Sequence, residues 1–239
     1  MRRAMSPTMN IEPGGGTTLL PLLRLLQLAS PSLPVGAYAY SQGLESAINE
    51  GWVTDAATTK EWCGDLLAFG HSYWDVPIFI RLHASWRLSD HGAVCHWSEL
   101  LLAGRETSEL QQEEYNLGKA LLRVMEPLGL TAAIGTLMPP RPPFLALFAA
   151  AAHQFGIAAR PACSAYLWAW AESQVMAATK LIPLGQNAAQ KILFELAIDI
   201  ESAVRAGAHL TDDELGMSAP GLAIASALHE TQYTRLFRS

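Results

Sequence analysis

The sequence is poor in charged residues, which make up only 16% of its 239 positions, whereas hydrophobic residues make up 50%. It contains no cluster of lysine or arginine, and its formal net charge is -6. A nucleic-acid-binding protein needs a basic face that displaces counterions from phosphates, so this class is excluded. The low content of charged residues predicts instead that some apolar surface lies against another protein, in an oligomer or a complex.

Cysteine is also scarce, since Cys63, Cys95 and Cys163 lie far apart and form no CxxC pair. This excludes a disulfide framework and a zinc knuckle, and it fits a reducing cytoplasm. His91 and Cys95 are four residues apart and could face one metal ion on a helix. Two ligands do not make a site, so we expect the Cys95 thiol to pack among apolar neighbours and predict no metal site.

The motifs of the common catalytic sites are missing. No GxxxxGK[ST] sequence is present to hold a nucleotide phosphate, and no GxSxG sequence is present to carry a nucleophilic serine. The seven histidines are scattered and form no triad with serine and aspartate. We therefore predict no catalytic residue and no cofactor site, which means that the protein is not an enzyme.

Two apolar stretches could be mistaken for membrane segments. The run Leu19–Leu28 follows two arginines as a signal peptide would, but Arg24 and other residues interrupt it. The stretch 162–182 approaches the length of a membrane span, yet Glu172 and Lys180 would then lie in hydrocarbon at a cost of roughly 2.5–3.5 kcal/mol per charge. We expect a buried helix there and no membrane partner.

Apolar residues recur at helical spacing along most of the chain, and no alternating pattern suggests a sheet. We predict an all-α protein with one domain at residues 17–239, preceded by a flexible tail at residues 1–16 that ends in three glycines. About ten helices should surround a central apolar helix at Ala162–Leu181. Two capping boxes, which begin at Thr58 and at Thr211, predict where two of these helices start.

Polar residues in the central helix leave two interpretations open. Glu172 and Gln174 must be paired within a buried network or face a partner, and the sequence does not choose between them. Lys180 lies near the end of the helix, where its charge meets the negative end of the helix dipole. A contact with a partner is the alternative for this lysine.

Two segments are predicted to bind a partner protein. The first is a loop that Pro31 and Pro34 stiffen and that carries two tyrosines, which are typical of interfaces. The second is the end of the sequence, which is unusually rich in aromatic, aliphatic and guanidinium groups for a terminus. The predicted partner-binding residues are Tyr38, Tyr40, Tyr233, Arg235, Leu236, Phe237 and Arg238. The alternative for the second segment is that it folds back on the protein's own core.

Three blocks of sequence resemble the urease accessory protein family UreF. They are residues 32–45 (SLPVGAYAYSQGLE), residues 165–186 (AYLWAWAESQV followed by KLIPLGQ) and residues 229–239 (HETQYTRLFRS). The resemblance extends from about Leu19 to Ser239. It implies an all-helical homodimer, a non-enzymatic maturation factor that assembles with UreD (also called UreH) and the GTPase UreG. This complex would deliver nickel to the urease apoprotein.

On the family's pattern, Tyr38 and the segment around Arg235 match regions that become ordered when UreD binds and that recruit UreG. The chain departs from the pattern at Ser173, where asparagine is usual, and at Ser108, where arginine is usual. The Ala-rich helix Phe144–Phe155 is a candidate for the dimer interface.

Two other functions stay open alongside the scaffold. The protein could activate GTP hydrolysis by UreG, with Arg235 or another exposed arginine stabilising the charge of phosphoryl transfer. It could also be a metallochaperone that binds nickel directly through His91 and Cys95.

Overall fold

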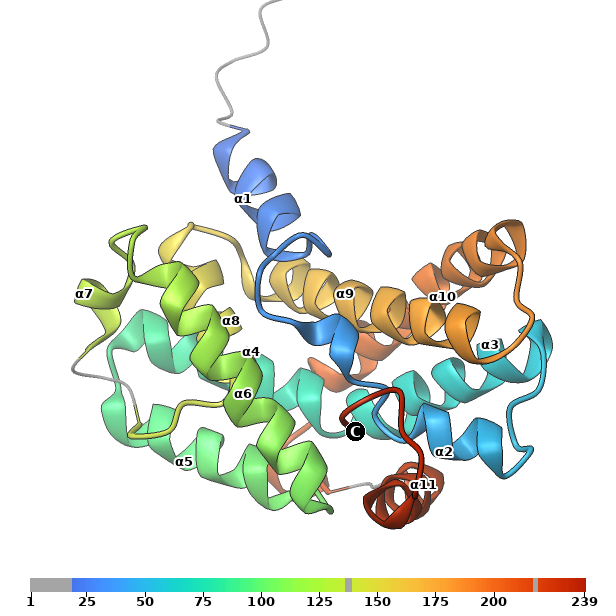
Figure 1. The fold of residues 1–239 in the computed structure, drawn as a ribbon. Coiled ribbons are helices and arrows are strands. Elements are labelled where there is room, and N and C mark those ends of the chain that lie inside the picture. Colours follow the sequence, from blue (N-terminus) through green and yellow to red (C-terminus); the bar gives the residue numbers. More distant parts are fainter. Residues whose placement is uncertain (1–18, 136–138, 217–218) are drawn as a thin grey trace, which may run out of the picture.

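The computed structural model describes residues 19–135, 139–216 and 219–239, and every regular element within these ranges is a helix (Figure 1). The prediction of an all-α protein with about ten helices is therefore confirmed. The predicted tail at residues 1–16 and the start of the domain near Thr17 lie outside the described residues.

The α-helices are α1 Leu20–Leu28, α2 Leu44–Asn49, α3 Ala56–Asp65, α4 Asp75–Leu88, α5 His91–Ala103, α6 Ser108–Met125, α7 Thr131–Ile134, α8 Phe144–Gln154, α9 Ala159–Leu181, α10 Gln186–Gly207 and α11 Pro220–Thr231. Shorter turns of helix are η1 Ala37–Ala39, the π-helical η2 Leu66–His71, and η4 Asp212–Glu214. None of the described helices is long and apolar enough to cross a membrane.

Helix α9 occupies the centre of the molecule, as predicted, with α10, α4, α8, α2 and α1 packed against it (Figure 1). Its many alanines let the neighbouring helices approach closely. The larger spaces are filled by a group of rings in which Tyr166 meets Phe79, Phe144 and Phe148 at centroid distances of 5.6–6.1 Å. Such tilted and edge-on pairs stabilise a core beyond the area that they bury.

Helix α8 is a second core helix, between α4 and α6, and each residue from Leu145 to Ala152 is buried. Close contact with α6 depends on Gly118, where a Cβ atom would come within 2.3 Å of the Pro142 carbonyl oxygen. The suggestion that this helix forms a dimer interface is wrong, because its apolar face already packs inside its own chain.

The two capping predictions have different outcomes. Thr211 and Glu214 do form a capping box, but around the short turn η4. Helix α3 is capped by Asp55, whose carboxylate accepts the Thr58 amide at 2.9 Å, so Thr58 is the third residue of the helix and not its cap. The prediction for Thr58 was wrong because aspartate, also a favoured cap, lies three residues earlier.

After α11, residues 232–239 do not continue the helix but return across the molecule toward α2 and η1 (Figure 1). Phe237 is buried in the core, and the Arg238 amide donates to the Ala39 carbonyl oxygen at 2.9 Å. The final stretch of sequence therefore folds back on the body of the protein. It does so as an extended segment and not as the last helix.

Candidate functional site

Helix α6 brings two adjacent carboxylates into the interior. Thr107 caps the helix, since its hydroxyl accepts the Leu110 amide, and this sets which face of α6 points inward. Glu113 and Glu114 lie on that face, and both are buried. Buried carboxylates need partners, because removing a charge from water is costly.

Arg105 supplies the partner for Glu114 and for Asp75 of α4. Its guanidinium lies 2.6 Å from the Glu114 carboxylate and 2.5 Å from that of Asp75, and all three side chains are largely buried. His71 adds a contact of 3.0 Å between its Nδ1 and Asp75. Burial alone would raise the pKa of Asp75, but Arg105 and His71 outweigh it and hold that pKa well below its ordinary range.

Glu113 has no cation within salt-bridge distance among the described residues and is held by neutral donors. Gln42 donates to one carboxylate oxygen at 2.8 Å, and the Ser239 hydroxyl donates to the other at 2.9 Å. Burial raises the pKa of Glu113 to about 7, although these two hydrogen bonds oppose the shift. The Gln42 amide oxygen in turn accepts the Trp170 indole N–H at 2.7 Å, which connects α6 to α9.

Glu45, at the start of α2, holds the returning chain. One of its carboxylate oxygens accepts the Leu236 amide at 2.7 Å, and the other accepts the Phe237 amide at 2.9 Å. Ser41 binds the same segment, because its amide donates to the Ser239 carbonyl oxygen at 2.7 Å. Residues 232–239, which we call the C-terminal segment, are thus fixed by side chains far away in the sequence.

The fully buried His229 of α11 reinforces this attachment. Its Nδ1 lies 2.7 Å from Glu109 and its Nε2 lies 3.3 Å from Glu45. Glu109 also pairs with Arg235 of the C-terminal segment, so a single chain of polar contacts connects α2, α6 and α11 to that segment.

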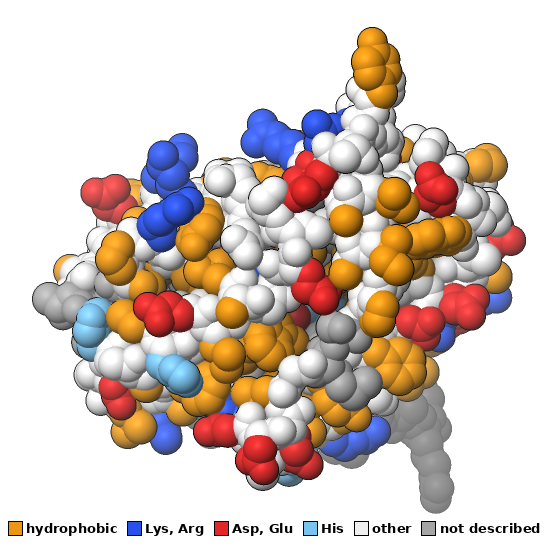
Figure 2. Space-filling view, turned by 90° about the horizontal axis from the view of Figure 1, so that it is seen from below, with side chains coloured by type: hydrophobic (Ala, Val, Ile, Leu, Met, Phe, Trp, Pro, Cys, Tyr) orange, Lys and Arg blue, Asp and Glu red, His pale blue; other side chains and the backbone are white. Residues whose placement is uncertain are grey.

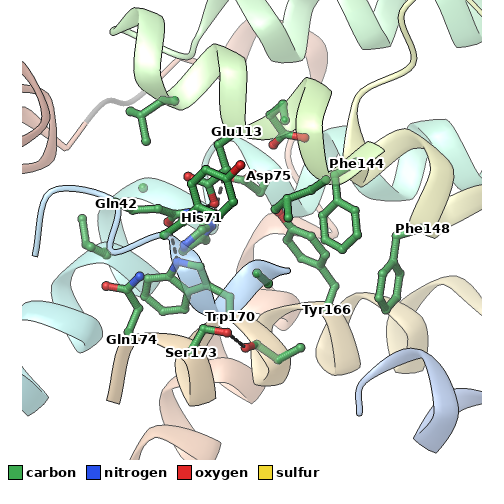
Figure 3. A pocket seen from close by; sticks show the side chains of 18 of the residues that line it. Gln42, His71, Asp75, Glu113, Phe144, Phe148, Tyr166, Trp170, Ser173 and Gln174 are labelled. Carbon is green, nitrogen blue, oxygen red and sulfur yellow. Dashed lines mark hydrogen bonds and ion pairs between the residues drawn. The ribbon is translucent and has the colours of Figure 1, made fainter. Parts of the chain in front are cut away.

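A pocket of about 460 Å³ opens between α6, α9 and the loop that precedes α2. In the close view, Gln42, His71, Asp75 and Glu113 surround it together with Tyr166, Trp170, Ser173 and Gln174 of α9 (Figure 3). The two carboxylates of α6 and the Arg105 network therefore form part of its wall. Because Glu113 also binds Ser239, the pocket and the C-terminal segment share a residue.

The structure places the predicted partner-binding residues in two groups. Exposed are Tyr38, at 69% of its surface and at the edge of the pocket, and Tyr233, Leu236 and Arg238. Arg235 is partly exposed in its ion pair with Glu109.

Tyr40 and Phe237 are instead buried. The Tyr40 hydroxyl accepts from Asn116 at 3.2 Å, and Lys180 lies 5.5 Å from the centre of the Phe237 ring. Lys180 therefore makes a cation–π contact within its own chain. Partner binding by the seven residues as a group stays a prediction.

The other candidates from the sequence are also placed. The Cys95 sulfur lies 3.7 Å from the nearest ring nitrogen of His91, and no group of three potential metal ligands occurs in the part of the chain that is described. Ser108 donates to Glu230 at 2.6 Å, and Ser173 donates to the Ala169 carbonyl oxygen at 3.0 Å while lining the pocket. At both positions where the sequence departs from the family's pattern, serine therefore makes a hydrogen bond within the chain, to another helix at Ser108 and to the preceding turn at Ser173.

The charged network is the feature that sequence reasoning missed: Glu45, Asp75, Arg105, Glu109, Glu113, Glu114 and His229 were not singled out. The sequence of α6 does contain one indication of this network. Glu114 lies at helical spacing between Leu110 and Leu117, in the row of buried residues that ends at Leu121. A carboxylate within an apolar row indicates a buried ion pair. Its partners come from other helices, and no spacing in the sequence identifies them.

Comparison with known proteins gives one consistent result. A sequence model of the UreF family matches residues 53–197. The chain is 46% identical to the urease accessory protein UreF of Alkalilimnicola ehrlichii, across 90% of this chain and 95% of that protein. The urease accessory proteins UreF of Chromohalobacter salexigens and of an Azoarcus species are 44% and 47% identical, each across 97% of this chain and 100% of the relative.

Proposed function

Because the chain belongs to the UreF family of urease accessory proteins, we propose that it is a non-enzymatic scaffold that assembles with UreD (UreH) and the GTPase UreG and so promotes nickel insertion into the urease apoprotein. A role in urease maturation follows from the family. The named partners, the route of nickel, a homodimeric state and a cytoplasmic location are parts of the proposal.

The observation that supports a scaffold most strongly is how the C-terminal segment is held. Two backbone amides on Glu45 and the Ser239 contacts fix a short irregular segment, which would otherwise fray. Fixing it displays Tyr233, which is fully exposed, and Leu236, at 64%, beside Arg235. A fixed backbone that presents aromatic and arginine side chains favours partner binding, because less backbone entropy is lost on binding.

The neighbouring surface suits the same role. On the side of the molecule where α5 and α11 lie, hydrophobic side chains stand among acidic and basic ones (Figure 2). Ile224 and Leu228 of α11 are among the exposed hydrophobic residues of the chain. A surface of this mixed kind is typical of an interface that assembles and separates.

This proposal is tested by replacing the exposed apolar groups of the C-terminal segment. The double variant Tyr233→Ser, Leu236→Ser should co-purify with less UreD and UreG and should activate urease poorly in cells that lack the wild-type chain. The matched control is Ile198→Ser, which removes from α10 an apolar side chain whose 66% exposure is close to the 64% of Leu236. Equal loss in the control, or none in the double variant, would contradict the proposed surface.

Activation of GTP hydrolysis is the second candidate, through Arg235. In the structure this arginine is paired with Glu109 and would have to leave it to reach a phosphate, which favours the scaffold. The variant Arg235→Ala separates the two. Loss of UreG binding supports the scaffold, whereas a variant that still binds UreG but no longer changes its rate of GTP hydrolysis supports the arginine finger.

A direct nickel carrier is the third candidate, and only the neighbouring side chains of His91 and Cys95 speak for it. Equilibrium dialysis of the isolated protein against nickel measures this directly. We expect no tight site, because structural metal sites use three or four protein ligands. A site that His91→Ala removes would support the carrier.

A further inference from the structure

The pocket between α6 and α9 carries an excess of negative charge. Among the described residues that line it, one arginine faces five carboxyl groups, those of Asp75, Glu106, Glu113, Glu114 and Glu172. Arg105 neutralises Asp75 and Glu114 only in part, since a single guanidinium serves both. A cleft that has more carboxyl groups than cations and that has apolar walls concentrates the electric field and attracts positively charged ligands.

Two polar groups in the wall of the pocket lack a partner. Tyr166 is only 8% exposed, and its hydroxyl makes no hydrogen bond to any residue that the structure describes. Gln174 is 1% exposed, and its amide oxygen is likewise without a donor in the described part of the chain. Buried polar groups are nearly always paired in folded proteins, so these two groups are available to accept hydrogen bonds from a molecule that enters the pocket.

Glu172 is a third group without a partner. It lines the pocket from the same helix, and no ion pair or hydrogen bond joins it to another described residue. Burial raises the pKa of Glu172, which shows that its position costs free energy when it is charged. A positively charged donor would relieve this cost.

The remaining walls of the pocket are hydrophobic. Leu33 and Val35 come from the loop before η1, Phe144 and Phe148 come from α8, and Trp170 comes from α9 (Figure 3). An aliphatic chain would pack against these side chains, and aromatic faces attract cations. The pocket therefore suits a ligand with an apolar stem and a charged end.

We propose that this pocket binds a cationic hydrogen-bond donor on an aliphatic stem, that is, an alkylguanidinium or an alkylammonium group. Tyr166, Glu172 and Gln174 offer acceptors at different points along α9, at least one of which would accept its hydrogen bonds, and the apolar walls would hold its stem. An anion would meet five carboxyl groups, and a bare metal ion would find no set of three suitable ligands among the described residues. This inference does not depend on the proposed function.

The test uses three probes of similar size and different charge: butylguanidinium, 1-pentanol and pentanoate. Each is titrated into the purified full chain, and binding is followed by ligand-observed NMR. We expect butylguanidinium to bind at least about tenfold more tightly than the neutral and anionic probes. Equal binding of all three, or no binding of butylguanidinium, would overturn the proposal.

Two variants connect the binding to this pocket. Glu172→Gln keeps the shape of a partly exposed side chain, and Tyr166→Phe removes only an unpaired hydroxyl, so both should fold normally. The variant at the point where the charged end binds should weaken butylguanidinium binding several-fold. Glu195→Gln, on the outer side of α10, is the control and should bind as the wild type does. Unchanged binding in both folded variants would contradict the assignment.

The cationic group could belong to a free small molecule or to a lysine or arginine side chain of a partner protein. Assembly with the accessory proteins is therefore measured with and without saturating butylguanidinium. Weaker assembly assigns the pocket to a partner's side chain, and unchanged assembly assigns it to a free molecule. This experiment identifies only the source of the cation. Whether the pocket prefers a cation at all is decided by the three probes.

Discussion

The attachment of the C-terminal segment should depend on both oxygens of Glu45. In the substitution Glu45→Gln, one oxygen becomes an NH₂ group, which cannot accept a hydrogen bond. Because each oxygen accepts a different backbone amide, that of Leu236 or that of Phe237, one of the two amides loses its partner. The new NH₂ group would also face an N–H donor.

The size of the effect follows from the buried and charged character of this contact. A hydrogen bond to a charged group contributes about 1.5–3 kcal/mol, and a buried donor left unpaired costs about 1–3 kcal/mol. We expect the segment to detach locally, because unfolding eight residues costs less than unfolding the protein. A loss of about 2 kcal/mol corresponds to a roughly 30-fold increase in the population of the detached state.

Hydrogen exchange at the amides of Leu236 and Phe237 measures this population. Exchange in the Glu45→Gln variant should be roughly 30-fold faster at these two amides and unchanged in α9. Glu50→Gln, at the exposed end of the same helix, is the matched control and should exchange as the wild type does. Unaltered exchange at both amides would refute the role given to Glu45.

Three further predictions concern stability, each measured by urea denaturation. Burial raises the pKa of Glu113 from 4.5 to about 7, so the folded state keeps a proton that the unfolded chain has lost. The stability due to this group should be full below pH 4.5 and fall by up to about 3 kcal/mol as the pH rises through 7, and Glu113→Gln should flatten this part of the profile. Arg105→Ala should cost about 3–5 kcal/mol, because it strands two buried carboxylates; a cost below 1 kcal/mol would show that water already compensates them. Gly118→Ala should cost about 1–3 kcal/mol, since its Cβ would overlap Pro142, whereas the helical control Gly92→Ala meets no such contact and should not destabilise.

Much of the fold could be predicted because helical periodicity is a local property. The central helix was predicted at Ala162–Leu181 and observed at Ala159–Leu181, since its continuous apolar character needs no distant information. The cap of α3 was misplaced because two favoured capping residues, Asp55 and Thr58, lie within one turn of each other. Only the backbone geometry decides between them.

The candidate site could be predicted only in part, because its contacts join residues that are far apart in sequence. Composition and the family's pattern pointed to Tyr38 and to Arg235, but the carboxylates of Glu45 and Glu109 that hold the C-terminal segment were not suspected. Glu172 was recognised as a charge that needed explaining. Its position in a pocket depends on how α9 packs against α6 and the loop before α2, which no local pattern encodes.

Size-exclusion chromatography with light scattering shows directly whether this chain is a scaffold for urease maturation. The chain is run alone, then with UreD, and then with both UreD and UreG. We expect a dimer that takes up UreG only when UreD is present. A monomer that binds neither protein would contradict the scaffold.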